Sequence, residues 1–322
     1  MANQNHESPA TLTDIREAAE RLTGIAHRTL VMTCWTLDQL AQRSLFFKCE
    51  NLQKVGAFKF RGACNAVLKL PLEQAKRGVV THSSGNHAQA LALAAKLRQI
   101  PAHIIMPSNS SEVKKNAVRG YGGRIIECEP TLEARETTAE QVLQETGGVF
   151  IHPYDNADII AGQGTAALEL LEEVPDLDAI IAPVGGGGLL SGTCIAAKGI
   201  KSDIRIFAAE PEGADDAARS LAKGELIPQT SPDTIADGLL TSLGELTWPI
   251  IRDHVERIFT IDDAEIIHAM KLMWERAKMI IEPSAAVPLA AMLSEEVRAI
   301  PEMKKVGVLL SGGNIDLNRL PW

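Results

Sequence analysis

The chain has 322 residues, which is long enough for more than one hydrophobic core. Its formal net charge is −9, from 32 basic and 41 acidic residues, and this balance argues against electrostatic binding to nucleic acid or to an anionic membrane surface. Hydrophobic residues make up 45% of the chain, but no apolar run is long enough to cross a bilayer, so we expect neither a membrane span nor a membrane partner.

The N-terminus and the cysteines indicate a cellular location. Residues Met1–Glu7 contain no basic region followed by an apolar core, so we expect no secretory signal. The five cysteines are odd in number and widely spaced, without a Cys-x-x-Cys pair: Cys34, Cys49, Cys64, Cys128 and Cys194. We therefore expect reduced thiols in a cytoplasmic protein, not a disulfide framework or a zinc site.

In chain order, strands and helices are predicted to alternate. A capping-box pattern at Thr11 predicts a first helix, which Gly24 ends. Predicted strands are Leu45–Cys49, Gly78–His82, Ala102–Met106, Arg124–Cys128, Gly148–His152, Leu177–Val184, Ile204–Ala209, Arg257–Ile261 and Lys305–Leu310. Predicted helices are Gly62–Leu70, Ala88–Leu97, Ser111–Tyr121, Thr131–Gln144, Ala161–Glu173, Leu189–Lys198 and Ala264–Lys278.

This alternation predicts an α/β fold of mostly parallel sheet flanked by helices. We expect two interleaved lobes: residues 75–150 would form the smaller one, and residues 1–74 and 151–322 the larger one. Ligands bind such sheets at the carboxyl ends of the strands, and here the loops at those ends are rich in glycine and serine.

Lys59 is the first candidate for chemistry. It lies between two aromatic residues in Val55–Ala63, where glycines and alanines surround it. Such surroundings remove solvation from an ammonium group, lower its pKa and make the neutral amine available to form a Schiff base with an aldehyde cofactor. A surface lysine beside an amphipathic helix would be the better interpretation for an arbitrary lysine, and the other motifs of the chain decide against it.

Three loops between strand and helix, or after the last strand, are candidate ligand sites. Gly185, Gly186, Gly187 and Gly188 follow a buried-type strand and open a helix, where backbone N–H groups can bind a phosphate. Neither a Gly-Lys-Ser/Thr sequence nor Gly-x-Gly-x-x-Gly is present, which excludes the common nucleotide motifs. The loop Ser83–His87 could hold a carboxylate and the loop Ser311–Asn314 a ring nitrogen, although alone each is an ordinary cap or turn.

Together these motifs resemble the fold-type II pyridoxal-phosphate enzymes (tryptophan synthase beta-like fold), in the branch that holds serine racemase and the serine/threonine dehydratases. The resemblance spans nearly the whole chain in family order. The matching stretches are Lys48–Gln53, Gly56–Ala63, Ser83–Gln89, Ala161–Thr165, Gly185–Gly188, Ala236–Gly238, Ile281–Ser284 and Ser311–Asn314.

The resemblance implies a role for each matching residue. Lys59 would form the Schiff base with pyridoxal 5'-phosphate and act as the base at the substrate Cα, and Phe58 would pack on the cofactor. Asn86 would bind the 3′ oxygen, Gly185 to Gly188 the phosphate, and Ser311 the pyridine nitrogen. Gly238 would lie beside the ring and Glu282 near its nitrogen edge. Ser83, Ser84 and His87 would surround the substrate carboxylate.

The reaction expected from this resemblance is elimination or racemisation of a β-hydroxy amino acid. A neutral Ser311 leaves the cofactor ring a weak electron sink, which favours loss of a β-leaving group, giving a 2-oxo acid and ammonia. Racemisation needs a proton donor on the face opposite Lys59, and the Ser84 hydroxyl can supply it. Arg135 would either pair with neighbouring acids on its helix or bind a distal carboxylate, and the second role would fit an L-threo-3-hydroxyaspartate dehydratase.

Several further expectations accompany this interpretation. By spacing alone Glu210 and Asp216 would be solvated acids, but the resemblance implies that they and the Ala214 carbonyl bind Mg²⁺, Ca²⁺ or Mn²⁺. It also implies a homodimer, and an adenine-nucleotide effector is conceivable at four residues: Gln89, Lys114, Lys115 and Tyr121. Histidines other than His87 are expected to have no special role. The alternatives are a cysteine-synthase-like enzyme, disfavoured by the Ser-Ser-Gly-Asn-His loop, and a metabolite-binding module with an inactive site, disfavoured by Lys59.

Overall fold

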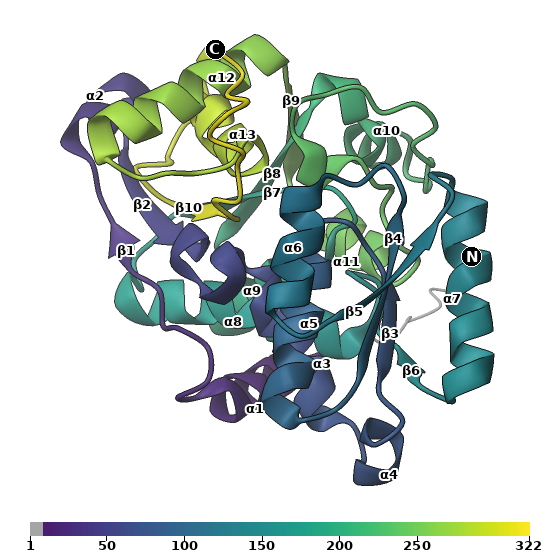
Figure 1. The fold of residues 1–322 in the computed structure, drawn as a ribbon. Coiled ribbons are helices and arrows are strands. Elements are labelled where there is room, and N and C mark those ends of the chain that lie inside the picture. The colour runs from purple at the N-terminus through teal and green to yellow at the C-terminus, as the bar shows by residue number, and fades with distance from the viewer. Residues whose placement is uncertain (1–8) are drawn as a thin grey trace.

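The computed structural model describes residues 9–322, so the expectation for Met1–Glu7 lies outside the described part. Two separate sheets, each covered by helices, form the α/β fold that the alternation predicts (Figure 1). No helix within residues 9–322 is long and apolar enough to cross a membrane.

The larger sheet has six strands in the order β1-β2-β10-β7-β8-β9. These are β1 (Val31–Met32), β2 (Ser44–Cys49), β7 (Ala179–Pro183), β8 (Arg205–Pro211), β9 (Arg257–Ile261) and β10 (Lys305–Leu310). Neighbouring strands are parallel except β1 and β2. Strands β7 and β8 are almost wholly buried, as parallel strands covered on both faces must be.

Helices cover both faces of the larger sheet. One face packs against α2 (Trp35–Ala41), α12 (Asp263–Leu272) and α13 (Pro283–Leu293). The other packs against α1 (Leu12–Leu22), α8 (Ala157–Glu173), α9 (Gly188–Ile200), α10 (Asp216–Lys223) and α11 (Thr247–His254). Short helical elements complete this part of the chain: η1 (Glu50–Leu52), η2 (Lys54–Gly56), η3 (Glu212–Ala214), η4 (Asp237–Leu239), the π-turn η5 (Met273–Ala277) and α14 (Glu295–Arg298).

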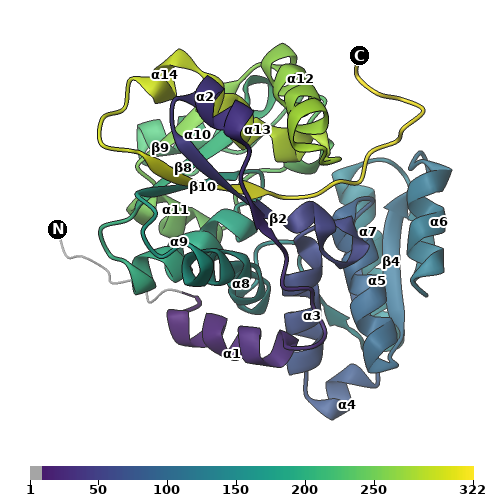
Figure 2. The same cartoon turned by 90° about the vertical axis from the view of Figure 1, so that its left-hand side faces the viewer.

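The smaller sheet has four parallel strands in the order β5-β4-β3-β6. Figure 2 shows this sheet, at its label β4, standing apart from the larger one. These are β3 (Val79–His82), β4 (Ala102–Pro107), β5 (Arg124–Cys128) and β6 (Val149–Phe150), and α4 (Leu72–Ala75) precedes them. Helices α5 (Asn86–Arg98) and α6 (Glu112–Gly120) pack on one face, and α7 (Leu132–Thr146) packs on the other. All four strands fall within the segment 75–150, while the division into two domains stays a prediction.

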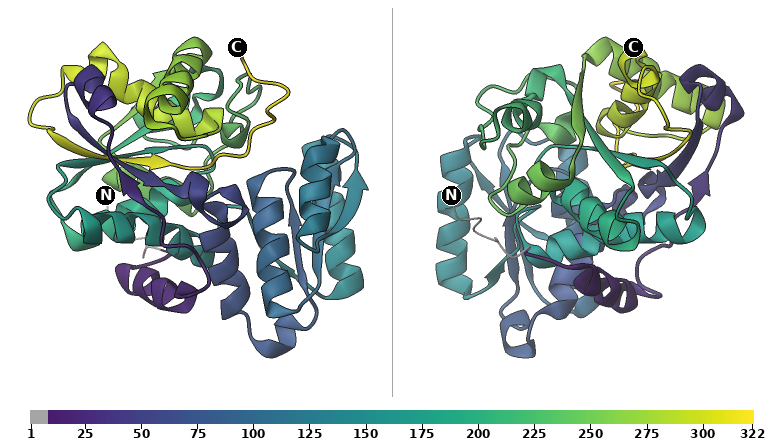
Figure 3. Two further views of the ribbon diagram at one scale, coloured as in Figure 1. Left: turned by 60° about the vertical axis from the view of Figure 1, so that its left-hand side comes forward. Right: turned by 180° about the vertical axis from the view of Figure 1, so that it is seen from behind.

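Helix α3 (Lys59–Lys69) lies between the two sheets, because it packs on α5 of the smaller sheet and on α8 of the larger one (Figure 3). Its contact with α8 depends on two glycines. A Cβ atom at Gly162 would lie 2.6 Å from the Cα of Gly62 and 2.8 Å from the carbonyl oxygen of Arg61, so the two helices approach at backbone distance.

The predicted elements differ from the structure at several helix ends, and seven α-helices and strands of the described residues were not predicted: β1, α2, α4, α10, α11, α13 and α14. Helix α3 begins at Lys59, three residues before the predicted start, and α5 begins at Asn86 instead of Ala88. The sequence analysis missed α13, because its residues are apolar on every side and Pro288 lies inside it. The capping box at Thr11 is confirmed, since Thr11 Oγ1 accepts the Asp14 N–H and the Asp14 carboxylate accepts the Thr11 N–H.

Candidate active site

A cavity of about 1190 Å³ collects the predicted ligand-binding residues from both sheets. Its lining includes every residue predicted to contact the cofactor or the substrate: Phe58, Lys59, Ser83, Ser84, Asn86, His87, Arg135, Gly185, Gly186, Gly187, Gly188, Gly238, Glu282 and Ser311. The predicted metal ligands Glu210, Ala214 and Asp216 do not line it.

Lys59 is the first residue of α3, and its side chain reaches the cavity. Its Nζ donates to the carbonyl oxygen of Pro153 at 2.8 Å and lies 5.2 Å from the ring centre of Phe58 and 5.9 Å from that of Tyr154. Burial lowers the pKa of the amine to about 8, and the charge of Glu282 opposes that shift only in part. A substantial neutral fraction is therefore present near neutral pH, as an amine that attacks an aldehyde requires.

The backbone before Lys59 is joined to the loop that follows β10. Ala57 and Gly312 form an isolated antiparallel bridge, and the Phe58 N–H donates to the Ser311 carbonyl oxygen at 3.0 Å. These contacts place Ser311 beside the lysine segment, although about 250 residues separate them in sequence. The predicted ring-nitrogen partner and the predicted Schiff-base lysine thus belong to one site.

The glycine loop before α9 fits a phosphate. None of the hydrogen bonds of residues 9–322 uses the backbone N–H of Gly185, Gly186 or Gly187 as donor. The loop ends at the N-terminus of α9, where unpaired N–H groups and the helix dipole favour an anion. Gly187 has φ +88°, and a Cβ at Gly186 would collide with the Tyr154 ring, so this close approach needs glycine.

The loop Ser83–His87 is open at its centre, since no atom lies within 4 Å of where a Cβ would project from Gly85. Asn86 begins α5; its Nδ2 donates to Glu282 Oε1 at 2.9 Å, and its Oδ1 accepts from Asn314 Nδ2 at 2.8 Å. Asn86 therefore lies where the two sheets meet.

His87 is only 2% exposed, and burial holds its pKa well below 6.5, so the imidazole is neutral. Its Nε2 lies 3.2 Å from the Ile151 carbonyl oxygen, which can only accept, so Nε2 carries the proton. Nδ1 is then an acceptor, and it has no partner among the described residues. Because Nδ1 carries no proton, it cannot donate a hydrogen bond to a carboxylate. The group of His87 that can donate one to a substrate carboxylate is the backbone N–H.

Glu282 lies at the base of the cavity and is 4% exposed. Burial and then the charge of Asp237 raise its pKa to about 7, although it accepts hydrogen bonds from Asn86 and from the Asn314 N–H at 3.1 Å. Gly238 is fixed nearby, since its N–H donates to Ser284 Oγ at 3.0 Å. Glu282 is thus an acid that changes protonation near neutral pH beside the predicted ring position.

Sequence reasoning missed four aromatic residues of the cavity: His82, Phe150, His152 and Tyr154. His152 Nδ1 accepts from the Asp155 N–H at 2.8 Å, and the ring lies 4.6 Å from that of Tyr154 with an interplanar angle of 85°. Burial lowers the His152 pKa to about 4. His82 is the last residue of β3 and His152 lies two residues beyond β6, so position at the carboxyl end of a strand was the signal that could have found them.

The expectation that Arg135 pairs with acids on its own helix is wrong for the described part of the chain. No carboxylate in residues 9–322 lies within ion-pair distance of its guanidinium, and its Nε donates to the Thr131 carbonyl oxygen at 3.3 Å. It lines the cavity from α7, and its charge contributes to the lowered pKa of His82, after burial. The other expected role, contact with a distal carboxylate, remains open.

Glu210 and Asp216 are 0% and 1% exposed, so solvated acids are excluded. Glu210 accepts the Ala218 N–H at 2.6 Å, and Asp216 accepts the Leu243 N–H at 3.2 Å. Burial raises the pKa of Glu210 to about 9 and that of Asp216 to about 6. Burial disfavours the ionised form of both carboxylates, and a hard divalent cation would stabilise that form. The carbonyl of Ala214, which lies between them in the sequence, would be a third ligand. No group of three His, Cys, Asp or Glu side chains suited to a metal occurs in residues 9–322, so this set depends on that carbonyl.

Comparisons with known proteins agree with this geometry. Serine racemase of Arabidopsis thaliana is 55% identical over 323 residues, covering 99% of this chain and 98% of that protein. The beta-hydroxyaspartate dehydratase of Paracoccus denitrificans is 50% identical, covering 97% of this chain and 98% of its own. The crystal structure of serine racemase from Dictyostelium discoideum superposes with a TM-score of 0.94 at 52% identity, covering 96% of this chain and all of that one.

A family model described as "Pyridoxal-phosphate dependent enzyme" matches residues 23–312, which is nearly the whole chain. Its range contains Lys59, the glycine loop and Ser311. The fold, the cavity and these matches lead to one conclusion: the chain belongs to the family of pyridoxal-phosphate-dependent enzymes.

Proposed function

We propose that this protein is a serine racemase that also has serine/threonine ammonia-lyase activity. The observation that carries the proposal is the Lys59 amine, whose pKa is lowered to about 8 in a cavity that it shares with the glycine loop and Ser84. Relatives named serine racemase, 53% and 55% identical over almost their full length, support the choice within the family.

The residues of the cavity fit pyridoxal 5'-phosphate. Gly185 to Gly188 would hold its phosphate, Asn86 its 3′ oxygen, Ser311 its ring nitrogen, and Phe58, Gly238 and Glu282 its ring. When bound, the cofactor links to the substrate amino group and withdraws electrons from Cα. Lys59 is the base that takes the Cα proton, and Ser84 is the hydroxyl that can return one.

Substrate binding is assigned to the loop Ser83–His87. The Ser83 and Ser84 hydroxyls and the backbone N–H of His87 would hold the substrate carboxylate, because the His87 ring offers only an acceptor to the cavity. Residues 75–150 would close over the substrate, and residues 1–74 and 151–322 would hold the cofactor.

The experiment incubates L-serine, D-serine, L-threonine and L-threo-3-hydroxyaspartate separately with the loaded enzyme and Mg²⁺, and measures keto acid and enantiomer. Formation of D-serine from L-serine together with pyruvate is the expected result. A Ser84→Ala variant is expected to lose racemisation by about 100-fold while keeping elimination, because only racemisation needs a second proton carrier. Keto acid from the aspartate analogue alone would overturn the racemase assignment.

The second candidate is an L-threo-3-hydroxyaspartate dehydratase. Arg135 favours it, since its guanidinium faces the cavity with no carboxylate partner in residues 9–322 and could bind a distal carboxylate. A relative named beta-hydroxyaspartate dehydratase, 50% identical, supports it as well. In that case Arg135→Met would abolish activity on the aspartate analogue and leave activity on serine.

We also propose that Glu210, Asp216 and the Ala214 carbonyl bind Mg²⁺, or Ca²⁺ or Mn²⁺ in its place, and that the protein is a cytoplasmic homodimer. Reduced cysteines fit that location, and all five thiols are free. An adenine nucleotide could act at Gln89 and Lys114, which lie at the cavity, while Lys115 is buried and ion-paired with Glu127.

A further inference from the structure

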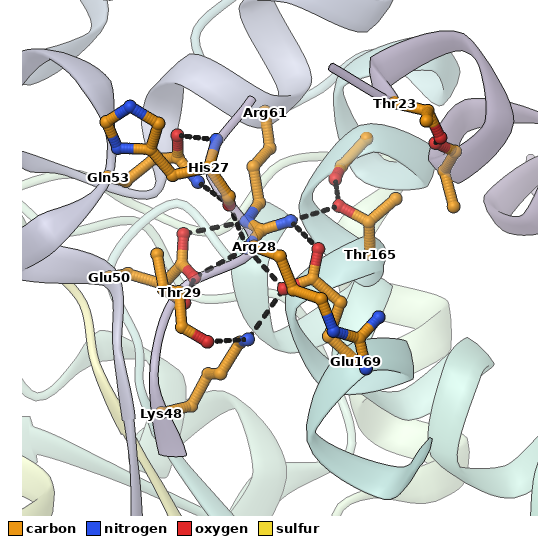
Figure 4. Close-up of polar contacts among 12 residues, drawn as sticks. Thr23, His27, Arg28, Thr29, Lys48, Glu50, Gln53, Arg61, Thr165 and Glu169 are labelled. Carbon is orange, nitrogen blue, oxygen red and sulfur yellow. Dashed lines mark hydrogen bonds and ion pairs between the residues drawn. The ribbon is translucent and has the colours of Figure 1, made fainter. Parts of the chain in front are cut away.

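The buried side chain of Arg61 follows Lys59 by two residues in the first turn of α3 (Figure 4). It is 1% exposed, and all three guanidinium nitrogens are used. The guanidinium makes six hydrogen bonds. Two are to Glu50, at 2.7 and 2.8 Å, and two are to Glu169, at 2.7 and 2.8 Å. The other two are to Thr165 Oγ1 at 3.1 Å and to the His27 carbonyl oxygen at 3.2 Å.

The cluster around Arg61 is balanced in charge. Lys48 donates to Glu169 at 2.6 Å and to the Thr29 carbonyl oxygen at 2.8 Å, and Thr29 Oγ1 donates to Glu50 at 2.6 Å. Two cations therefore face two carboxylates. A neutral cluster of this kind changes the field at Lys59 little, so any effect of Arg61 on Lys59 must come from geometry.

Other attachments also join the start of α3 to the larger sheet. Its N-cap, Phe58, makes no side-chain cap, but the Phe58 N–H donates to the Ser311 carbonyl oxygen at 3.0 Å. The Gly62 N–H donates to Gln163 Oε1 of α8 at 3.1 Å. The apolar side chains of the helix belong to the core of the smaller sheet, while its glycine side packs on α8. Residues two apart on a helix point to nearly opposite sides, so Arg61 holds the side of the turn that faces away from the Lys59 amine.

We propose that Arg61 is the positioning residue for Lys59: its bidentate bonds to Glu50 at the end of β2 and to Glu169 on α8 hold the first turn of α3 against the larger sheet. The inference rests on the proposed role of Lys59. Because α3 is shared with the smaller sheet, this attachment keeps the amine in register with the glycine loop and Ser311, which belong to the larger one. Lysine cannot replace arginine here, since an ammonium group lacks the planar fork that matches two carboxylates.

The test compares Arg61→Lys with Arg43→Lys in the full-length protein. Arg43 also makes several guanidinium bonds, to the carbonyl oxygens of Val297, Arg298, Ile300 and Met303, but it lies just before β2, at the end of that strand away from Glu50. Both substitutions keep the charge and remove a multidentate guanidinium. Thermal unfolding and circular dichroism establish that each variant is folded.

Two readouts follow. In the aldehyde-free protein, the pKa of the Lys59 amine is measured by the pH dependence of its acetylation, followed by mass spectrometry. We expect Arg61→Lys to raise this pKa from about 8 toward the ordinary 10.5, because a loosened amine gains water, and Arg43→Lys to leave it unchanged. In the loaded enzyme, Arg61→Lys is expected to lower kcat about 100-fold at unchanged KM.

An unchanged Lys59 pKa and kcat in Arg61→Lys, or equal changes in Arg43→Lys, overturn the proposal. If Arg61→Lys does not fold, Glu169→Gln breaks one of the two bidentate pairs at similar volume, and an unaltered Lys59 pKa in that variant overturns the proposal equally. Failure of the Lys59 assignment itself is a different result, because borohydride would then link the cofactor to another residue of the native protein.

Discussion

Two buried lysines in this protein have opposite surroundings. Lys48 forms an ion pair with Glu169, while Lys59 faces a carbonyl oxygen and two aromatic rings, with no carboxylate within ion-pair distance in residues 9–322. Burial without a counter-charge favours the neutral amine, whereas burial with one favours the ion. The reactivity of the Lys59 amine therefore comes from the absence of a carboxylate partner among residues 9–322.

The rate at which the protein binds the aldehyde cofactor should depend on the neutral fraction of the Lys59 amine. At pH 7 a pKa of about 8 leaves about one amine in ten neutral, against about one in 3,000 for an ordinary lysine. We expect the rate of pyridoxal phosphate uptake by cofactor-free protein to rise with pH to a midpoint near 8. Stopped-flow absorbance measures this rate. A midpoint above 10, or uptake by Lys59→Ala at the same rate, would contradict the assignment.

The buried acids Glu210 and Asp216 predict how the stability of the protein depends on pH and on a divalent cation. In the cation-free protein their folded-state pKa values, about 9 and about 6, lie above the unfolded values of 4.5 and 3.8. As pH rises, these carboxyl groups lose their protons at a lower pH in the unfolded protein than in the folded one. The free energy of unfolding therefore decreases as pH rises from about 4 to about 9. A bound divalent cation removes that penalty by pairing with the ionised carboxylates.

Mg²⁺ should therefore raise the melting temperature more at pH 8 than at pH 5.5. At a concentration of one hundred times Kd the stabilisation is about 2.7 kcal/mol. Calorimetry with Mg²⁺ and with EDTA at both pH values measures it. Glu210→Gln keeps an acceptor for the Ala218 N–H but removes the charge, and a Mg²⁺ effect that survives in this variant would rule out the site.

Helix–helix contact at backbone distance is the main feature at the scale of elements. Helix α8 meets α3 through Gly62 and Gly162, and meets α9 through Gly164 and Gly192. A Cβ at Gly192 would lie 2.5 Å from the Gly164 nitrogen and 2.5 Å from the Ile160 carbonyl oxygen. The position of α9 fixes the glycine loop at its N-terminus, so this packing also sets the predicted phosphate site.

Gly192→Ala should push α9 away from α8 and cost about 1–3 kcal/mol of folding free energy, with weaker binding of pyridoxal phosphate. Gly120→Ala is the matched control, because it also lies in a helix and no atom stands within 4 Å of the added methyl group. Urea unfolding and cofactor titration measure both effects. Equal stability of the two variants would show that α8 and α9 tolerate separation.

The sequence predicted the buried strands well, because their runs of aliphatic residues mark them even without alternation, and it missed several helices. Strands such as β4 and β10 match their predicted ranges closely. Helix α13 was missed because an element apolar on all sides has no amphipathic period to detect. The early start of α3 was missed because Phe58 provides no capping side chain, so no local signal marks the helix end.

At the scale of the whole molecule, the site was predictable where its residues belong to motifs. Asn86, the glycine loop and Ser311 follow the carboxyl ends of β3, β7 and β10, Lys59 begins α3, and the structure brings all of them to one cavity. His82, His152 and Tyr154 share that cavity but belong to no motif, and their approach depends on how the smaller sheet stands against the larger one. No local sequence pattern predicts how the two sheets are arranged relative to each other.

Strand β2 pairs with β10, so Ser44 lies opposite Lys305 and Cys49 opposite Leu310. During synthesis, β1 and β2 are made before Lys59, whereas β10, the other neighbour of β2, is made long after it. The larger sheet cannot be completed until the last residues have been translated, because β10 fills the gap between β2 and β7. Such long-range pairing slows folding, because the long segment between β2 and β10 must close before these strands can pair.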